Sequence, residues 1–298
     1  MPLAVFPKCY LKAMCVDKSM TVDAWIEQAA TLDVDGLEFY AGFTPVDAAE
    51  IRRLRALAES RDLSIPMMCY SPDFTVPDAR QRAAEIETQK RIIATTAALG
   101  GKFCRVLSGQ RRAGLSVAEG LARVTACIHE VLPSAEKHGV TLILENHYKD
   151  GFWEFPEFAQ KMDVFLDLLE RIPDSPWFGV NYDPSNAIIA GDDPIALLQA
   201  VKSRVKTMHA SDRYFDGGSI EDLRKFESHP MQGYAPILKH GVIGKGLNDY
   251  DKIFSILKSV GFAGWISIED GEDPDVGMEH LRLSAIFLRE KMAAHGIS

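Results

Sequence analysis

The sequence predicts an α/β fold, a single (β/α)8 barrel over residues 1–298. Three observations predict it. Short apolar segments alternate eight times with longer amphipathic segments, as strands alternate with helices around a parallel sheet. No low-complexity tract or change of composition divides the chain, and its length suits such a barrel, which usually holds ~250 residues and more with inserted loops. An open doubly wound sheet is the alternative, but the first turn lacks the GxGxxG phosphate loop typical of that fold.

The first half of the chain supplies four pairs of a strand and a helix. Thr21 can cap the first helix, and Gly100 and Gly101 stand where glycine commonly follows a helix end. Pro66 is unusual in a strand, because proline cannot donate a hydrogen bond to a central ladder. The predicted elements, strand before helix, are residues 3–6 and 21–32, 36–40 and 46–61, 63–69 and 78–99, and 102–107 and 116–138.

The second half of the chain continues the alternation. Residues 140–147 are a run of apolar and β-branched residues that ends in a carboxylate, an amide and an imidazole, which is typical of a strand buried on both faces. An irregular segment of about residues 211–247 is rich in glycine and polar residues, and loops of this length are usually functional or mobile. The predicted elements are residues 140–147 and 155–172, 177–183 and 193–202, 205–209 and 250–260, and 265–269 and 277–294.

The bulk composition argues against several classes of function. A formal net charge of −9 disfavours a broad surface for nucleic acid or an anionic membrane and favours a small polar substrate. The five cysteines are odd in number and show no CxxC spacing, which predicts reduced core residues rather than disulfides or a zinc site. No apolar stretch approaches the ~20 residues of a membrane span, and residues 1–8 do not resemble a signal peptide, so we expect a cytoplasmic protein.

Four consecutive predicted strands end in residues that can bind a metal. Active sites of (β/α)8 barrels form at the carboxyl ends of the strands. The last four strands end there in Glu145, Asp183, His209 and Glu269. Three carboxylates and one imidazole suit Mn²⁺, Mg²⁺ or Co²⁺ better than zinc, which favours thiolates, and they leave positions for substrate oxygens. We therefore expect one divalent ion, with Mn²⁺ as the first candidate.

Each of these residues also has a structural explanation. Glu145 can be a loop acid, Asp183 can start a turn or cap a helix before Pro184, and His209 can be a hydrogen-bonded core histidine. Glu269 lies in an acidic run that resembles a solvated turn. Because all four explanations would have to hold at the same layer of the barrel, a shared metal site is the favoured interpretation.

Five segments resemble a known family: Gly36-Leu-Glu-Phe-Tyr40, Leu144-Glu-Asn-His147, Asn181-Tyr-Asp-Pro-Ser-Asn186, Met208-His-Ala-Ser-Asp-Arg213 and Ser267-Ile-Glu-Asp270. The chain resembles the xylose-isomerase-like TIM barrels, in the branch of sugar phosphate isomerases and epimerases. The resemblance implies that Glu145, Asp183, His209 and Glu269 bind one divalent metal. It also implies that Glu145 and Glu269 act as acid and base, and that a keto-sugar is isomerised or epimerised through a metal-stabilised enediolate.

The sequence departs from the ketose-epimerase pattern at two positions. Asn186 stands where that pattern has a histidine that contacts the substrate, and His147 follows Glu145 by two residues, on the same face of an extended strand. The context of His147 resembles the catalytic subunit of C-glycoside deglycosidases, which implies a lyase that cleaves a 3-keto-glycoside by enolate elimination with His147 assisting. Such enzymes work with a small second subunit, whereas an epimerase is expected to be a homo-oligomer.

Further residues are candidates for substrate binding, each with a structural alternative. Arg213 can bind a substrate hydroxyl, carboxylate or phosphate or lie in a surface loop, Lys245 lies between two glycines and can be part of a turn, and Glu38 can reach the pocket from the second strand. Endonuclease IV, a DNA-repair enzyme with the same barrel, is a remote alternative. It needs three zinc ions and additional histidines at early strand ends, where this acidic chain has Tyr40 and Cys69.

Overall fold

The predicted (β/α)8 barrel is confirmed by the computed structural model. The structure describes residues 1–227, 235–269, 271 and 273–297. The barrel strands are β1 (Leu3–Val5), β2 (Gly36–Tyr40), β3 (Ser64–Cys69), β4 (Phe103–Val106), β5 (Thr141–Glu145), β6 (Phe178–Tyr182), β7 (Val205–Ala210) and β10 (Trp265–Ile268). They close in the order β1-β10-β7-β6-β5-β4-β3-β2, and every pairing is parallel.

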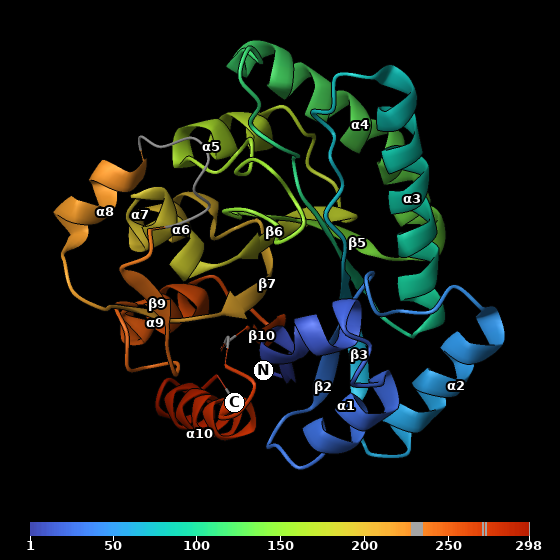
Figure 1. The fold of residues 1–298 in the computed structure, drawn as a ribbon, viewed down its shortest axis with the longest axis vertical. Helices are drawn as coiled ribbons and strands as arrows, with labels where there is room; N and C mark the ends of the chain where they lie inside the picture. The colour runs from blue at the N-terminus through green and yellow to red at the C-terminus, as the bar shows by residue number, and fades with distance from the viewer. Residues whose placement is uncertain (228–234, 270, 272, 298) are drawn as a thin grey trace.

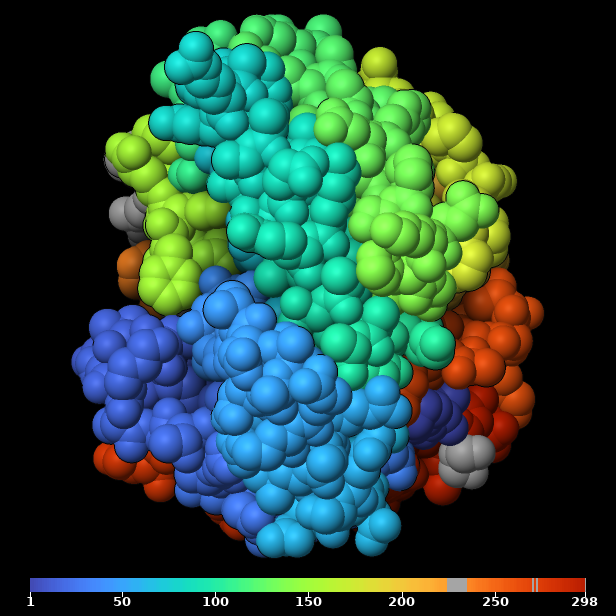
Figure 2. Space-filling model, turned by 90° about the vertical axis from the view of Figure 1, so that its right-hand side faces the viewer, coloured from blue at the N-terminus to red at the C-terminus, as the bar shows by residue number. Residues whose placement is uncertain are grey.

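A ring of helices surrounds the strands (Figure 1). The helices are α1 (Val22–Ala29), α2 (Ala48–Glu59), α3 (Ala79–Ala98), α4 (Val117–His138), α5 (Met162–Glu170), α6 (Pro184–Ala190), α7 (Pro194–Val201), α8 (Ile220–Glu227), α9 (Tyr250–Ser259) and α10 (Gly277–Ala294), with a 3-10 helix at Lys8–Tyr10 and a π-helix at Lys12–Val16. Figure 2 shows α2, α3 and α4 side by side on one face. None of the helices in the described part of the chain is long and apolar enough to span a membrane.

The register of the strands places one polar layer inside the barrel. Alternate residues of a strand point to opposite faces, so Thr207 and His209 of β7 share a side. Ser267 pairs with His209 across β10 and β7, and the Thr207 hydroxyl donates to Asn181 Oδ1 on β6 at 2.7 Å. Outside this layer the strands and helices bury a continuous apolar core. The polar layer therefore lies in the barrel interior and leads to the carboxyl ends of the strands.

Pro66 is accommodated in β3 by a β-bulge. The pairing of β2 with β3 shifts register between Gly36↔Ser64 and Glu38↔Met67, so β3 has one extra residue there. The Pro66 carbonyl still accepts a hydrogen bond from the Lys102 backbone amide at 2.8 Å. A bulge leaves one residue outside the ladder, which removes the need for the N–H that proline lacks.

The helix predicted over residues 155–172 is wrong in its first third. Helix α5 begins at Met162, and the preceding residues are a loop. The backbone amide of Glu157 donates to the Tyr148 carbonyl at 2.8 Å, and that of Phe158 donates to the Gly109 carbonyl at 2.7 Å. These amides bond to neighbouring loops rather than to a helical turn.

Two regions contain more regular structure than the sequence predicted. Asp183 caps the short helix α6, because its Oδ1 accepts a hydrogen bond from the backbone amide of Asn186 at 3.0 Å. Pro184 occupies the first helical position. The irregular segment after β7 contains β8 (Arg213–Phe215), α8 and β9 (Leu238–His240), and β8 pairs antiparallel with β9. Residues 228–234 of this segment lie outside the described residues.

Candidate active site

The four residues predicted as metal ligands meet at the carboxyl end of the barrel. Glu145 is the last residue of β5, Asp183 and Glu269 directly follow β6 and β10, and His209 lies in β7. One candidate ligand atom from each lies within 4.8 Å of the other three, and all four side chains are buried. Asp183 is also the cap of α6, so the structural and the functional interpretation of this residue hold together.

The distances in this cluster fit a divalent ion. His209 Nδ1 lies 3.1 Å from Glu145 Oε1 and 3.3 Å from Glu269 Oε2. Ligand bonds of ~2.1 Å at right angles place neighbouring donor atoms ~3 Å apart. The donors are carboxylate oxygens and one imidazole, which suits Mg²⁺, Mn²⁺, Co²⁺ or Zn²⁺.

The electrostatics of the cluster also favour a cation. Burial, Glu269 and Glu145 raise the pKa of Asp183 to about 7, because a third carboxylate is costly to ionise beside two others. Burial alone would raise the pKa of Glu145, but His209 and Arg105 outweigh it and lower the pKa to about 2. A bound divalent cation would relieve the repulsion that Asp183 meets.

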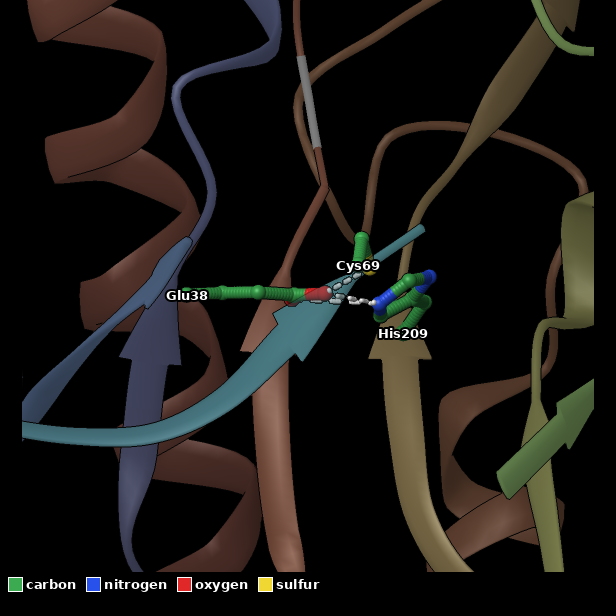
Figure 3. A group of neighbouring side chains, drawn as sticks. All are labelled: Glu38, Cys69 and His209. Atoms are coloured by element: carbon green, nitrogen blue, oxygen red, sulfur yellow. Dashed lines mark hydrogen bonds and ion pairs between the residues drawn. The ribbon is translucent and has the colours of Figure 1, made fainter. Parts of the chain in front are cut away.

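His209 is oriented by a second group of buried side chains, Glu38 of β2 and Cys69 of β3 (Figure 3). His209 Nε2 lies 2.9 Å from Glu38 Oε1, and the Cys69 thiol donates to the same oxygen at 2.5 Å. A metal bound between Cys69 and Glu38 would hold sulfur and oxygen more than ~3 Å apart, so this group is a hydrogen-bond relay rather than a second metal site. An Nε2–H donated to Glu38 would leave the Nδ1 lone pair for a cation bound in the four-residue cluster.

Replacement of Glu38 by glutamine is expected to weaken metal binding by about 10–100-fold, because the Nε2–H of His209 loses its anionic acceptor. Titration of the metal-free protein with Mn²⁺, followed by calorimetry, measures the dissociation constant. The matched control is Glu85→Gln, which changes a glutamate of α3 that accepts a hydrogen bond from Tyr70. Equal Mn²⁺ affinity in the Glu38 variant and the control would contradict the role of Glu38.

Two cations in the site were missed in the sequence. Arg105 of β4 donates to Glu145 Oε2 at 2.9 Å and to the Ser71 hydroxyl at 2.9 Å. Lys8 donates to Glu269 Oε1 at 3.0 Å, and Glu269 is the main reason that the pKa of Lys8 is raised, against the effect of burial. Each glutamate thus turns one oxygen to the cluster and the other to a cation. An arginine inside an apolar strand, and a lysine just after one, are the signals that could have revealed them.

A cavity of about 250 Å³ lies beside the cluster. Lys8, Arg105, His147 and Glu269 line its inner part. Its wall also includes Leu11, Val16 and Phe152, and Phe152 is 64% exposed. The cavity therefore joins a charged end at Glu269 to a wall of mixed character, in which Leu11, Val16 and Phe152 lie among Lys12, Lys149 and Asp150.

The other predicted catalytic residue and one predicted substrate residue lie at this end of the barrel. His147 lines the cavity, and burial lowers its pKa to about 4, so its ring is neutral at pH 7. Asn186 is buried and donates from Nδ2 to Glu145 Oε1 at 3.1 Å. Asn186 thus contacts a candidate ligand directly.

Two further predicted substrate residues, Arg213 and Lys245, are not among the residues that line the cavity. Arg213 is buried, with its guanidinium 5.5 Å from the centre of the Tyr148 ring and Nη2 2.7 Å from His240 Nε2. The Lys245 side chain is exposed, and Lys245 is not among the residues that line the cavity. The flanking Gly244 and Gly246 amides donate to Asp212 Oδ2. This turn is therefore held by Asp212 rather than by contacts of Lys245 with the cluster.

The five cysteines are free in the structure, and all but the half-buried Cys15 are buried.

A comparison with models of protein families identifies the family of this chain. A family model described as "Xylose isomerase-like TIM barrel" matches residues 26–291. The chain belongs to this family. Among curated proteins, an inosose dehydratase from Bacillus thuringiensis (strain Al Hakam) is 24% identical over 169 residues, which cover 55% of this chain and 52% of that protein. The chain thus spans about half the length of the curated relatives it matches.

Solved structures of xylose-isomerase-like fold cover almost the whole chain. A D-tagatose 3-epimerase-like protein superposes with a TM-score of 0.76 at 19% identity, covering 99% of this chain and 98% of that one. An IolI protein with a bound zinc atom superposes with a TM-score of 0.76 at 16% identity, covering 99% of both chains. At these identities the likeness establishes the shared fold.

Proposed function

We propose that this protein is a divalent-metal-dependent sugar isomerase or epimerase that acts on a keto-sugar through an enediolate. The observation that carries the proposal is the cluster of Glu145, Asp183, His209 and Glu269 beside a cavity at the carboxyl end of the barrel. A divalent cation bound there, with Mn²⁺ as the first candidate, would act as a Lewis acid on the sugar carbonyl and the neighbouring hydroxyl. The dehydratase and epimerase relatives support a sugar as substrate.

Glu145 and Glu269 are the proposed acid and base. Strands β6 and β7 separate β5 from β10 in the barrel, so the two glutamates approach the cluster from different sides. One carboxylate removes the proton from the carbon next to the carbonyl, and the other returns a proton to the opposite face or the adjacent carbon. Lys8 and Arg105 hold the outer oxygens of the two glutamates and fix their orientation.

A lyase is the second candidate function. His147 lines the cavity as a third group that can assist proton transfer, and the side chains of Leu11, Val16 and Phe152 in the cavity wall offer contacts to an apolar substituent on the sugar. Both features fit a C-glycoside deglycosidase-type lyase that eliminates the substituent of a 3-keto-glycoside, and the dehydratase relatives likewise catalyse an elimination by name.

The proposal also covers the cellular location and the oligomeric state of the enzyme. If the protein is an epimerase, it is proposed to be a cytoplasmic homo-oligomer. If it is a deglycosidase-type lyase, it is proposed to associate with a small second subunit.

Exchange of substrate C–H with D₂O tests the proposal. The protein, supplied with Mn²⁺, is incubated in D₂O with a panel of free ketoses, inososes and 3-keto-glycosides, and the products are followed by NMR and mass spectrometry. Deuterium in a recovered or epimerised sugar supports the isomerase or epimerase. Loss of water or release of an aglycone supports the lyase. Absence of exchange and of products across the whole panel, with one equivalent of metal bound, would overturn both.

A further inference from the structure

A buried glutamate that the proposed function does not use lies behind His147. Glu157 is 1% exposed, and its Oε1 accepts hydrogen bonds from the Ser108 amide at 2.6 Å and the Ser108 hydroxyl at 2.5 Å. Its Oε2 lies 3.9 Å from His147 Nδ1. Within the described part of the chain, neither Oε2 nor Nδ1 has a hydrogen-bond partner, although both atoms are buried. The two atoms face each other.

The loop before α5 holds Glu157 in this place. The backbone amide of Glu157 donates to the Tyr148 carbonyl, so the loop returns to the strand end that carries His147. The next residue, Phe158, is buried against Gly120 of α4, where a Cβ would lie 2.2 Å from the ring. The position of Glu157 is thus fixed by packing and by backbone hydrogen bonds on either side.

The hydrogen bonds of Ser108 leave Oε2 as the oxygen of Glu157 that is available to carry a proton. The Ala159 amide donates to the Ser108 hydroxyl oxygen at 3.0 Å, so the hydroxyl hydrogen is free to point at Glu157 Oε1. Oε1 then accepts from two donors and Oε2 from none. A buried carboxyl without a cation in contact takes up a proton, and burial raises the pKa of Glu157 to about 8. The proton belongs on Oε2, facing His147.

The other ring nitrogen of His147 opens to the cavity. Nδ1 is a buried atom without a partner, whereas Nε2 is not among such buried atoms and makes no hydrogen bond to a described residue. The side chain lines the same cavity wall as Lys8 and Glu269. A substrate bound beside the metal ligands would therefore meet Nε2.

We propose that Glu157 is a positioning residue for His147: Glu157 Oε2–H donates to His147 Nδ1, so that His147 presents Nε2–H to a substrate oxygen. The present distance of 3.9 Å closes to a hydrogen bond with a side-chain shift of ~1 Å. The inference rests on the proposed function. It assigns the substrate a third oxygen at the cavity, beyond the carbonyl and hydroxyl oxygens that a cation would take.

A neutral imidazole N–H can polarise an oxygen without being ionised. Two glutamates can remove and return one proton in either an epimerisation or an elimination, and the Nε2–H of His147 adds a donor that can hydrogen-bond to a leaving oxygen. The Glu157–His147 pair therefore fits a substrate that carries a hydroxyl or O-linked substituent on the carbon beside the one that loses its proton, as in a dehydration.

The tautomer of His147 tests this inference without any substrate. In ¹⁵N-histidine-labelled protein, long-range ¹H–¹⁵N NMR spectra distinguish the two tautomers, and loss of one signal set in His147→Gln assigns the residue. We expect Nε2–H in the wild type and in Glu157→Gln, whose amide also donates to Nδ1. Glu157→Met removes the donor, and we expect a mixture of tautomers. A wild-type ring protonated on Nδ1, or an unchanged tautomer in Glu157→Met, would overturn the proposal.

Kinetics with the substrate found by D₂O exchange give a second readout. Glu157→Met is expected to lower kcat by about 10–100-fold with KM little changed, whereas Glu157→Gln stays within a few-fold of the wild type. In a His147→Gln background, Glu157→Met should add no further loss. Glu154→Gln, an exposed glutamate of the same loop, is the control. Additive losses in the double variant would contradict action through His147, and thermal unfolding checks that each variant is folded.

Discussion

Replacement of Glu145 or Glu269 by glutamine is expected to abolish exchange of a substrate C–H with D₂O, with a loss of at least ~10³-fold in each variant. An amide cannot accept the proton, and positioned acid or base catalysis contributes about 10²–10⁴-fold. Glutamine also leaves a buried cation without its charge partner, Arg105 in the first variant and Lys8 in the second. Weaker binding of the metal adds to the loss.

The structural effect of these substitutions has to be separated from the catalytic one. Breaking a buried ion pair can cost about 3–5 kcal/mol, so thermal unfolding and metal content are measured on both variants. The matched control is Glu85→Gln, which lies outside the cluster and should keep full exchange. Exchange retained by both folded, metal-loaded variants would remove Glu145 and Glu269 as acid and base.

Elemental analysis after mild purification should find close to one divalent ion per chain. The reason is the position of His209, whose Nδ1 lies 3.1 Å from Glu145 and 3.3 Å from Glu269, with Asp183 in the same cluster. Chelation should abolish turnover, and addition of Mn²⁺, Mg²⁺ or Co²⁺ should restore it. Because a ligand at 100 times its Kd stabilises the native state by about 2.7 kcal/mol, we expect Mn²⁺ at that level to raise Tm by roughly 5 °C.

Asp183→Asn tests the same site through one ligand. We expect it to lower the bound metal well below one ion per chain and to lose most of the Mn²⁺-dependent rise in Tm, since the carboxylate of Asp183 is replaced by a neutral amide. Asp163→Asn, an acidic residue in the first turn of α5, should behave like the wild type. A metal-free protein with unimpaired turnover would disprove the metal-dependent function.

The sequence was sufficient to predict the layer of residues at the strand ends. Glu145, Asp183, His209 and Glu269 each follow an apolar run, and in a parallel barrel every strand delivers its carboxyl end to the same face. The local pattern of an apolar run followed by a polar residue is therefore enough to predict these four residues of the candidate site. The alternation of strand and helix likewise predicted the barrel, because buried parallel strands leave a strong apolar signal.

The groups around that layer could not be predicted from local patterning. Lys8 acquires its role from Glu269, 261 residues away, and Arg105 looks like a break in an apolar strand until Glu145 is placed beside it. Glu157 fell inside a predicted helix, because its amide bonds to the distant Tyr148 carbonyl rather than within a turn. Such partners depend on how the loops fold over the barrel.

The pairing of β1 with β10 affects the order in which the barrel folds. Strand β1 pairs with β10 through Leu3, Ala4 and Val5, which lie opposite Ile266, Ser267 and Ile268. The barrel therefore cannot close until the last strand has formed. Pairings this distant along the chain form slowly. Lys8 and Glu269 meet across the same pairing, whereas the strands that carry the four candidate ligands, β5, β6, β7 and β10, are consecutive neighbours without it. The four ligands can therefore assemble before the barrel closes, and closure adds the contact of Lys8 that holds the outer oxygen of Glu269.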